Sequence, residues 1–423
     1  KENRIFTYKD LFSPYLGYFR KDNFLAIKGV EHQYNNYLSS GNDYAIKAQR
    51  DVSFNSILNG KVKRTKKQEA QDIHLNIAVN IQINIEQLLS KYKNKVQADE
   101  IIASVMESDT GKIVAIATSN RFNPEFIEKN DISNLNIRAV EYSFEPGSVM
   151  KPIIVSFLME KDNLKKDDIR NAYNGKYKLG NKTISDDHPA NWMSIENAII
   201  HSSNIVLAQL GISLEPKAFY YALNQFGFGK YSGIDLGYES IGVLPSMKEL
   251  ERDVRRATVS YGYGIQTTFI QMLRAYAIFN NNGFLVKPTI VDYVSDSKNN
   301  KLKIHSDKKQ ILSLKTSEII KDILIKTVKK GTGNGADIEG LEIGGKTGTA
   351  RVFKNQIYSR EYVSSFFGFA NDKTKKYTIG VSAFNPKTVF YASQTAVPVF
   401  KGIVDVLVKN KYLNKEIELK KEP

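Results

Sequence analysis

The sequence predicts an α+β fold, in which a five-stranded antiparallel sheet is flanked by helices. Three observations support this: an apolar hairpin pattern over residues 103–118, a mostly helical middle over residues 148–282, and three strand patterns that precede an amphipathic helix over residues 395–409. The hairpin and the three later segments supply the five strands, and the helices between and after them are available to cover the sheet.

Composition limits the classes to which the protein can belong. Apolar residues make up 42% and charged residues 25% of the 423 residues, which is ordinary for a folded protein. The net charge is +15, but the basic residues are scattered outside two short clusters at 61–67 and 420–421, and no nucleic-acid-binding motif occurs. We therefore predict a solvated basic face and no nucleic-acid partner. Attraction to an anionic envelope or membrane surface is the alternative.

The chain offers no recognisable metal or cofactor motif. It has no cysteine, and its five histidines form no H-E-x-x-H or comparable pair, so the sequence predicts neither a metal nor a cofactor. The lack of cysteine suits an oxidising compartment. No run of about 18 apolar residues occurs, and Lys1 begins the sequence without a signal-peptide pattern. We expect this to be the soluble portion of a longer protein whose membrane anchor is missing.

The amino-terminal residues predict a small separate module. Residues 1–67 are polar and aromatic with weak periodicity, and they end in the basic run K-V-K-R-T-K-K. Because such a run is typical of an exposed connection, we divide the chain into residues 1–67 and 68–423. The second part opens with I-H-L-N-I-A-V-N-I-Q, which alternates with period 2 and passes into a helical pattern by Ile83 to Leu89.

Five apolar segments predict the sheet. The first two form a hairpin over residues 103–118 around S-D-T-G, where Gly111 can adopt a positive φ. The mostly helical region over residues 148–282 is broken by glycine-rich turns at 226–229 and 262–264. The last three strands are expected at L-E-I-G-G-K-T-G-T-A-R-V, S-S-F-F-G-F-A and Y-T-I-G-V-S-A-F, ahead of the closing helix.

The stretch E-P-G-S-V-M-K-P contains the first candidate for chemistry, with Ser148 three residues before Lys151. A helix that begins near Ser148 would put both residues on one face, with the ammonium beside the hydroxyl. A serine needs a neighbouring base to act as a nucleophile, and a lysine kept neutral by burial or by a nearby cation can be that base. The helix N-terminus also favours an oxyanion. On its own, S-x-x-K is weak evidence, because most such matches lie on a solvated helix surface.

The second candidate is H-S-S-N, His201 to Asn204. From one bend, the Ser202 hydroxyl could relay a proton and the Asn204 amide could hold a substrate carbonyl. Taken alone, the same residues are typical of a helix cap or a turn.

The third candidate is G-G-K-T-G-T-A, Gly344 to Ala350, which is typical of a strand in which Gly348 lets a ligand backbone approach closely. A phosphate-binding P-loop is the competing interpretation, because residues 340–347 fit the pattern G-x-x-x-x-G-K-[ST]. However, the intervening residues are strand-like, and no helix follows Thr347 to receive a phosphate at its N-terminus.

The order S-V-M-K, S-S-N, K-T-G-T is the signature of active-site serine penicillin-recognising enzymes. The chain is similar over nearly its whole length to the class B penicillin-binding proteins, which are monofunctional peptidoglycan D,D-transpeptidases. The resemblance also rests on K-G-V-E-H-Q-Y-N-N-Y-L-S-S-G, A-S-V-M-E-S-D-T-G-K-I-V-A-I-A, F-N-P-E-F, Q-F-G-F-G and Y-G-Y-G-I-Q-T-T-F-I-Q-M. R-R-A-T-V-S-Y-G-Y-G-I resembles the septal, FtsI-like members, whereas elongation-specific relatives tend to read G-Q-G in place of G-Y-G.

The resemblance implies a catalytic role for four residues. Ser148 would attack the carbonyl between the two terminal D-alanines of a stem peptide, with Lys151 as the base that takes its proton. Ser202 would pass a proton to the leaving D-alanine, and Asn204 would orient the donor peptide and Lys151. The base of acylation differs among proposals for this superfamily, so the role of Lys151 is a hypothesis.

The resemblance assigns substrate binding to the third motif. Lys346 would supply positive potential, the hydroxyls of Thr347 and Thr349 would hold the terminal carboxylate, and Gly348 would give the substrate backbone room. The backbone N–H groups of Ser148 and Thr349 would form the oxyanion hole, in which each donor is worth roughly 3 to 4 kcal/mol.

The resemblance also implies the penicillin-recognising serine transpeptidase fold, with residues 1–67 as part of an amino-terminal pedestal or dimerisation-like module and residues 68–423 as the transpeptidase domain. Three departures stand out: no R-G-x-I-x-D-R text of the pedestal is present, Y-A-S-Q precedes T-A-V-P-V-F where the family has a glycine pair, and S-S-N is followed by Ile205 where glycine is frequent.

Other activities use overlapping residues. A class A β-lactamase deacylates with the glutamate of an E-x-x-x-N arrangement, and no glutamate between Asn204 and Lys346 has an asparagine four residues on. A D,D-carboxypeptidase would use the same site with water as acceptor, an elongation-specific transpeptidase would share the chemistry, and a silent divisome scaffold would need neither Ser148 nor Lys151.

The resemblance implies a set of partners and a location. The expected partners are peptidoglycan stem peptides, β-lactam antibiotics, a glycosyltransferase and other divisome membrane proteins, with no nucleic acid among them. The expected location is the bacterial inner membrane, with the catalytic domain in the periplasm.

Overall fold

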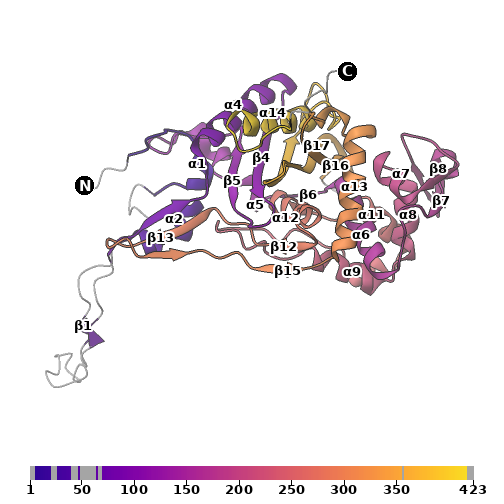
Figure 1. Ribbon diagram of the computed structural model, residues 1–423, viewed down its shortest axis with the longest axis horizontal. Helices are drawn as coiled ribbons and strands as arrows, with labels where there is room; N and C mark the ends of the chain where they lie inside the picture. Colours follow the sequence, from indigo (N-terminus) through magenta and orange to yellow (C-terminus); the bar gives the residue numbers. More distant parts are fainter. Residues whose placement is uncertain are drawn as a thin grey trace, which may run out of the picture.

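A five-stranded antiparallel sheet in the order β16-β17-β18-β4-β5 forms the centre of the protein (Figure 1). This computed structural model describes residues 5–20, 26–39, 46–47, 63–64, 69–354 and 357–416. The hairpin predicted over residues 103–118 supplies two strands and the carboxy-terminal segments supply three, which confirms the predicted fold class. The strands are β4 (Glu100–Glu107), β5 (Ile113–Thr118), β16 (Glu342–Lys354), β17 (Ile357–Asn371) and β18 (Lys376–Phe384).

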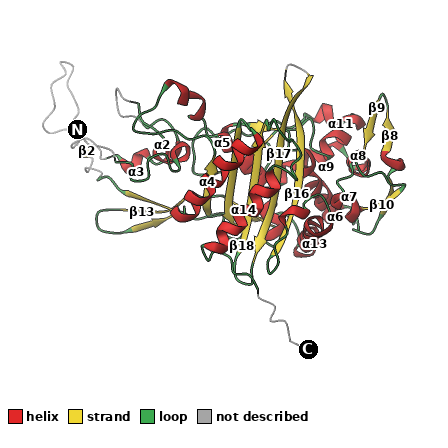
Figure 2. Ribbon diagram, turned by 90° about the horizontal axis from the view of Figure 1, so that it is seen from above, coloured by secondary structure: helices red, strands yellow, loops and turns green. Residues whose placement is uncertain are grey.

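Helices cover both faces of the sheet (Figure 2). Phe366 and Phe367 are neighbours on β17, so their side chains point to opposite faces. Phe366 packs edge-on against Phe400 of α14 (Ala396–Lys409), which lies beside α4 (Val79–Val96). Phe367 packs against Phe269 of α12 (Phe269–Asn280), whose neighbour is α13 (Leu314–Lys330). Each face therefore has a fully buried apolar layer, with the sheet between the two.

The region between the hairpin and the last three strands is helical at its core and carries small hairpins. Its helices are α5 (Arg138–Glu141), α6 (Lys151–Lys161), α7 (Ile195–Ile200), α8 (Asn204–Ser213), α9 (Pro216–Gln225), α10 (Met247–Leu250) and α11 (Asp253–Ser260), and its 3-10 turns are η1 (Lys129–Asn134), η2 (Gly147–Met150) and η3 (Tyr173–Gly175). The sequence predicted a mostly helical region here and named no strands in it. In the structure β7 (Ile169–Asn171) pairs with β10 (Trp192–Ser194), and β8 (Lys176–Leu179) pairs with β9 (Lys182–Ser185).

Short strands join distant parts of the chain. The pairs are β6 (Ser143–Phe144) with β11 (Thr267–Thr268), β12 (Phe284–Val286) with β15 (Lys308–Gln310), and β13 (Val291–Ser295) with both β14 (Lys301–Lys303) and β3 (Asp72–Leu75). The 3-10 turn η4 (Asn334–Ala336) connects α13 to β16. Helix α4 begins at Val79, four residues before the predicted helical pattern at Ile83.

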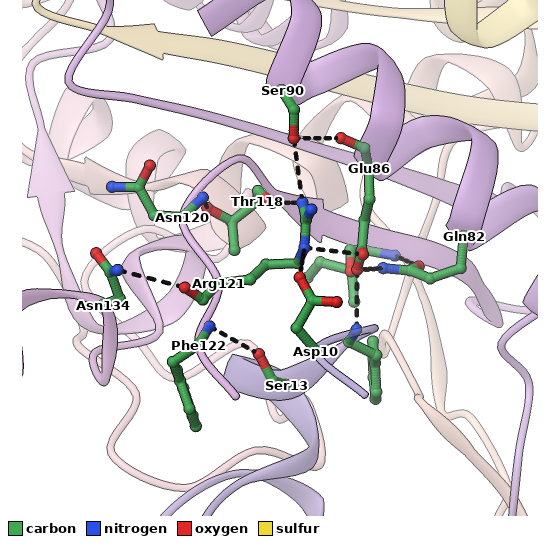
Figure 3. Close-up of polar contacts among 12 residues, drawn as sticks. Asp10, Ser13, Gln82, Glu86, Ser90, Thr118, Asn120, Arg121, Phe122 and Asn134 are labelled. Carbon is green, nitrogen blue, oxygen red and sulfur yellow. Dashed lines mark hydrogen bonds and ion pairs between the residues drawn. The ribbon is translucent and has the colours of Figure 1, made fainter. Parts of the chain in front are cut away.

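The amino-terminal residues form several short elements, of which the region around α1 packs against the rest of the chain. These elements are α1 (Ser13–Leu16), α2 (Gly29–Gln33), α3 (Asn35–Leu38), β1 (Ile46–Lys47) and β2 (Lys63–Arg64). Near α1, Arg121 forms ion pairs with Asp10 and Glu86, both at 3.1 Å, and the Phe12 N–H donates to Glu86 at 2.9 Å (Figure 3). The predicted boundary at residue 67 lies outside the described residues.

None of the helices in the described part of the chain combines the length and the apolar composition that crossing a membrane requires.

Candidate active site

Ser148 lies in the 3-10 turn η2 at the start of α6, and hydrogen bonds to its two neighbours hold the backbone of this turn in place. The Gly147 N–H donates to the Gly262 carbonyl at 3.0 Å, and a Cβ at Gly262 would lie 2.0 Å from the Gly147 oxygen. Tyr276, fully buried on α12, donates its hydroxyl to the Val149 carbonyl at 2.8 Å. The α-helix begins at Lys151, and the residues before it wind more tightly than the sequence predicted.

The K-T-G strand packs directly against this turn. Alternation along β16 points Lys346, Gly348 and Ala350 to one face. On that face a Cβ at Gly348 would lie 2.8 Å from the Pro146 oxygen, so a larger residue there would push the nucleophile turn away. The structure thus brings the first and third motifs into contact, and Gly348 provides a close backbone approach whose neighbour is the protein's own turn.

The S-S-N motif occupies the bend between α7 and α8. Ser202 has φ +61°, a conformation that is uncommon for a residue other than glycine, and the bend aims both its carbonyl and its hydroxyl at Lys151. Asn204, the first residue of α8, presents Oδ1 to the same ammonium. The second motif therefore meets the first through a single nitrogen atom.

Lys151 is fully buried and donates three hydrogen bonds. Its Nζ lies 2.5 Å from the Ser202 carbonyl, 3.0 Å from the Ser202 Oγ and 2.8 Å from the Asn204 Oδ1. These acceptors use all three donors of a protonated lysine. The sequence placed the ammonium beside the Ser148 hydroxyl, but the bonds it forms in this structure go to the S-S-N motif, because one turn of α6 aims Lys151 toward α8.

An aspartate that sequence reasoning missed anchors the second motif. Asp186 follows β9 and accepts hydrogen bonds from the Ser203 hydroxyl at 2.5 Å, the Asn204 N–H at 2.6 Å and the Ile205 N–H at 3.1 Å. The Asn204 side-chain amide donates to the Ser185 carbonyl at 3.0 Å. These bonds fix which way Asn204 faces, leaving its Oδ1 for Lys151.

The third motif forms a hydroxyl cluster with a second residue that sequence reasoning missed. Lys346 is fully buried and donates to Thr332 Oγ1 at 3.3 Å, the Thr347 carbonyl at 3.2 Å and Thr347 Oγ1 at 3.4 Å. Thr347 in turn donates its hydroxyl to Thr332 at 2.7 Å. Thr349 Oγ1 accepts the Ala392 N–H at 3.1 Å, which ties β16 to the loop before α14. Thr332 lies in the glycine-rich text G-T-G-N-G, and that composition is the signal that could have marked it.

Burial lowers the pKa of both lysines. Burial is the largest cause for Lys151, whose pKa lies well below its ordinary value; the charge of Lys346 lowers it further, and Asp186 and Asp187 oppose the shift. Burial alone lowers the pKa of Lys346 to about 7. A pair of buried amines so close together favours the state in which one is neutral, which is the condition for Lys151 to accept a proton.

The three predicted motifs converge on one place, the junction of the sheet edge β16 with the helices α6 and α8. Ser148 is partly exposed there, while Lys151 and Lys346 are buried behind it. A nucleophile at the surface, a low-pKa amine one turn away and a cationic strand beside them can carry out acyl transfer.

Residues 101–405 match the family model described as the penicillin binding protein transpeptidase domain. The chain belongs to the penicillin-binding protein transpeptidase family. Among relatives, it is 28% identical over 387 residues to the peptidoglycan D,D-transpeptidase FtsI of Buchnera aphidicola. The aligned residues make up 91% of this chain and 66% of that protein. It is also 28% identical over 416 residues to stage V sporulation protein D of Bacillus subtilis, covering 95% of this chain and 63% of that one. These names indicate the class B type of penicillin-binding protein.

Solved structures share the fold. Penicillin-binding protein 3 of Mycobacterium tuberculosis superposes with a TM-score of 0.84 at 24% identity, over 99% of this chain and 92% of that one, and a further structure of that protein is complexed with aztreonam. The transpeptidase domain of Burkholderia pseudomallei penicillin-binding protein 3 gives a TM-score of 0.70 at 25% identity, over 81% of this chain and 98% of that one. The shared fold extends to the amino-terminal segment in the first case.

Proposed function

We propose that this penicillin-binding protein is a serine D,D-transpeptidase that cross-links peptidoglycan stem peptides through an acyl-enzyme. The observation that carries the proposal is the meeting of three motifs at Lys151 and β16, with Lys151 in contact with both Ser202 and Asn204 and the nucleophile turn packed on Gly348. Relatives named peptidoglycan D,D-transpeptidases support the substrate class.

The proposed acylation uses the contacts of Lys151. Neutral Lys151 takes the proton of the Ser148 hydroxyl, directly or through the Ser202 Oγ that lies 3.0 Å from its nitrogen. The Ser148 oxygen then bonds to the carbonyl carbon between the two terminal D-alanines, and the C–N bond breaks. Ser202 returns the proton to the departing amine. The product is an ester between Ser148 and the shortened donor peptide.

The oxyanion hole and the carboxylate site remain parts of the proposal. The backbone N–H groups of Ser148 and Thr349 lie on the two segments that Gly348 holds in contact, which supports their joint use at one oxygen atom. Lys346 provides positive potential to the terminal carboxylate. The Thr347 hydroxyl donates to Thr332, so carboxylate binding by Thr347 requires an exchange of partners. Thr349 only accepts the Ala392 N–H, so its own O–H can still donate to a carboxylate.

Cross-linking completes the cycle. The amine of a second stem peptide attacks the ester carbonyl, its proton passes to Lys151, and the bond to the Ser148 oxygen breaks as that oxygen is reprotonated. β-Lactams resemble the donor and would be held as a stable ester at the same atom. The mycobacterial structural neighbour, which is complexed with aztreonam in one structure, supports β-lactam binding.

We assign the protein to division at the septum, with residues 1–67 as part of a pedestal module and 68–423 as the transpeptidase domain. The text Y-G-Y-G and the FtsI relative support this over the elongation role. A glycosyltransferase and other divisome proteins are the proposed partners, and the outer face of the inner membrane is the proposed location, because the cross-linked substrate lies there.

The test of the acyl-enzyme is mass measurement after incubation with a penicillin. We expect a stable adduct of one penicillin on the intact chain and none on Ser148→Ala, with Ser133→Ala, an exposed serine away from the site, as the matched control that still forms it. An unmodified parent mass would support a scaffold, and rapid loss of the adduct would support a β-lactamase. If D-alanine is released and the acyl group passes to water and not to the added amine, the result would support a carboxypeptidase.

A further inference from the structure

Glu145, three residues before the nucleophile, is a buried carboxylate with one oxygen left unpaired. Glu145 is only 9% exposed. Oε1 accepts the Gly264 N–H at 2.7 Å and the Tyr358 hydroxyl at 3.3 Å, whereas Oε2 has no hydrogen-bond partner within the described part of the chain. Leaving a charged buried acceptor unpaired is costly, and such a group marks a place where a ligand supplies the missing donor.

An unpaired donor lies in the same cluster. Arg255 on α11 packs its guanidinium against Gly264, and its Nη2 forms an ion pair with Glu249 at 3.1 Å. Its Nε is buried and, over the residues that the structure describes, has no partner. The charge of Arg255 acts on Glu145, and both side chains contact Gly264, so the unpaired donor and the unpaired acceptor belong to one cluster beside the nucleophile turn.

Lys182, Tyr263 and Tyr358 lie at the solvent side of this cluster. Lys182, exposed at the start of β9, feels the charges of both Glu145 and Arg255, and no ion pair joins it to Glu145 among the described residues. The rings of Tyr263 and Tyr358 meet edge to face with centroids 5.7 Å apart, and Tyr358 is 43% exposed. Aromatic rings beside a carboxylate are typical surroundings of a bound ammonium group.

The charges here balance in a way that selects the ligand. Among the four charged side chains that surround the unpaired atoms, Glu145 and Glu249 offset Lys182 and Arg255, while Arg252 acts on Glu249 and Arg351 acts on Tyr263 from outside this group. A group that carries an ammonium and a carboxylate on one carbon satisfies both unpaired atoms, the ammonium at the Glu145 Oε2 and the carboxylate at the Arg255 Nε and Lys182.

We propose that Glu145, Arg255 and Lys182 form a subsite for a zwitterionic amino-acid group of the stem peptide, such as the end of a diaminodicarboxylic acid side chain. The inference rests on the proposed transpeptidase function and names a substrate class for it. The same group could belong to the donor peptide or to the acceptor, whose attacking amine then lies beside its own carboxylate.

The experiment compares three donors that differ at the end of one side chain: a zwitterionic diaminodicarboxylic acid, lysine and Nε-acetyl-lysine, each followed by D-alanyl-D-alanine. Complete labelling with penicillin gives the fraction of molecules in each variant whose Ser148 can be acylated. The rate of D-alanine release is then divided by that fraction before variants are compared. For the unchanged chain we expect kcat/KM to be highest for the zwitterionic donor, lower for the lysine donor and lowest for the acetyl-lysine donor. The lysine donor, which has the ammonium group, should exceed the acetyl-lysine donor by about tenfold.

Two variants separate the two charges. Glu145→Gln should reduce the lysine to acetyl-lysine ratio to about one, and the exposed change Lys182→Ser should reduce the zwitterion to lysine ratio by about threefold while leaving the ammonium ratio in place. Glu239→Gln is the matched control, because Glu239 is also a buried carboxylate with a raised pKa that accepts backbone N–H groups, from Ser232 and Gly233.

A second experiment identifies which stem peptide, donor or acceptor, carries the zwitterionic group. With acetyl-lysine as donor, the fraction of ester captured by a zwitterionic amine rather than by water is measured for the same chains. A loss in this arm alone assigns the subsite to the acceptor, and a loss in the donor arm alone assigns it to the donor. Equal rates for all three donors together with an unchanged capture fraction in Glu145→Gln would overturn the proposal. Absence of penicillin labelling in the unchanged chain would instead refute the proposed function.

Discussion

At the scale of single residues, the site depends on two buried amines whose charges compete. Lys151 contacts the S-S-N motif and Lys346 contacts two threonine hydroxyls, and burial disfavours the charged form of each. Because a neutral Lys151 is needed as a base and a charged Lys346 as a carboxylate receptor, their different surroundings separate the two roles. Asp186 and Asp187 limit how far the pKa of Lys151 falls.

The titration of Lys346 gives a pH dependence with a definite sign. Its pKa is lowered to about 7, so Lys346 carries its charge below that pH and loses it as the pH rises. The kcat/KM ratio of a donor ending in a free carboxylate to the same donor ending in a carboxamide should therefore fall as the pH increases through about 7. Titration of Lys151 affects both donors and cancels in the ratio. A ratio that stays constant from pH 6 to 9 would contradict this role of Lys346.

Thr332 should matter to catalysis although the motifs do not include it. Thr332→Val removes the acceptor of the Thr347 hydroxyl and one of the three acceptors of Lys346, and leaving the Thr347 donor unpaired costs about 1–3 kcal/mol. We expect penicillin acylation to slow by about tenfold or more, measured by stopped-flow mixing. Thr332→Ser keeps the hydroxyl and should retain most of the rate; slowing in Thr332→Ser but not in Thr332→Val would show that the methyl group, not the hydrogen bond, is what counts.

At the scale of elements, glycine contacts set how the motif-bearing segments meet. Gly262 and Gly147 touch backbone to backbone, and Gly348 lets β16 reach Pro146. Each contact joins a segment from a different part of the chain to the turn that carries Ser148. A side chain at any of these points would separate segments whose spacing the chemistry requires.

Gly262→Ala should disrupt the site by steric conflict. Its Cβ would lie 2.0 Å from the Gly147 oxygen, and the residue has φ +87°. Gly180→Ala is the matched control, because Gly180 also has a positive φ, +57°, with nothing within 4 Å of the added carbon. We expect a loss of about 1 kcal/mol in unfolding free energy for Gly180→Ala from backbone strain, and a loss about 1–3 kcal/mol greater for Gly262→Ala.

Urea unfolding monitored by fluorescence gives both free energies, and penicillin acylation gives the functional effect. Acylation should slow in Gly262→Ala and stay near the parent rate in Gly180→Ala. Similar losses of stability in the two variants would mean that strain at positive φ, rather than collision with the nucleophile turn, accounts for the effect.

At the scale of the whole molecule, an ion-pair network around the buried Glu86 fastens the amino-terminal residues near α1 to the rest of the chain. Arg121 bridges Asp10 and Glu86, and its guanidinium also donates to the Thr118 carbonyl at 3.1 Å (Figure 3). Burial raises the pKa of Glu86 to about 6, and the charge of Arg121 opposes that shift. The segment that holds Asp10 and Phe12 is thus joined to helix α4 and to the residues after β5.

Arg121→Gln should loosen this attachment. Removing one partner of a buried pair leaves Glu86 and Asp10 close together without a cation, at a cost of about 3–5 kcal/mol. Hydrogen exchange at the amide of Phe12 should accelerate well before exchange in the central sheet. Lys354→Gln, which breaks the exposed pair with Glu361, is the control and should cost less than about 1 kcal/mol. Unchanged protection at Phe12 in Arg121→Gln would argue against the network as the attachment.

The sequence by itself determined the five strands of the sheet, the closing helix and the three motifs, because alternation, glycine placement and short spacing are local properties. The family followed from the motifs in order. The small hairpins at 169–194 were missed. The pair β8–β9 carries a local signal in K-Y-K-L-G-N-K-T-I-S, whose two-residue Gly-Asn turn is typical of a hairpin. The pairing of β7 with β10 has no such signal, because it joins segments that lie on either side of that hairpin.

Tertiary structure alone decided which atoms meet. Ser148 and Lys151 are one turn apart in the text, yet the amine bonds to Ser202 and Asn204, because the path of α6 against α8 sets its direction. Asp186, Thr332 and Glu145 join the site through contacts between residues far apart in sequence, and such contacts depend on how the elements pack. Burial, which lowers the pKa of both lysines, is likewise a property of the folded chain, because no spacing along the sequence specifies how much water reaches an amine.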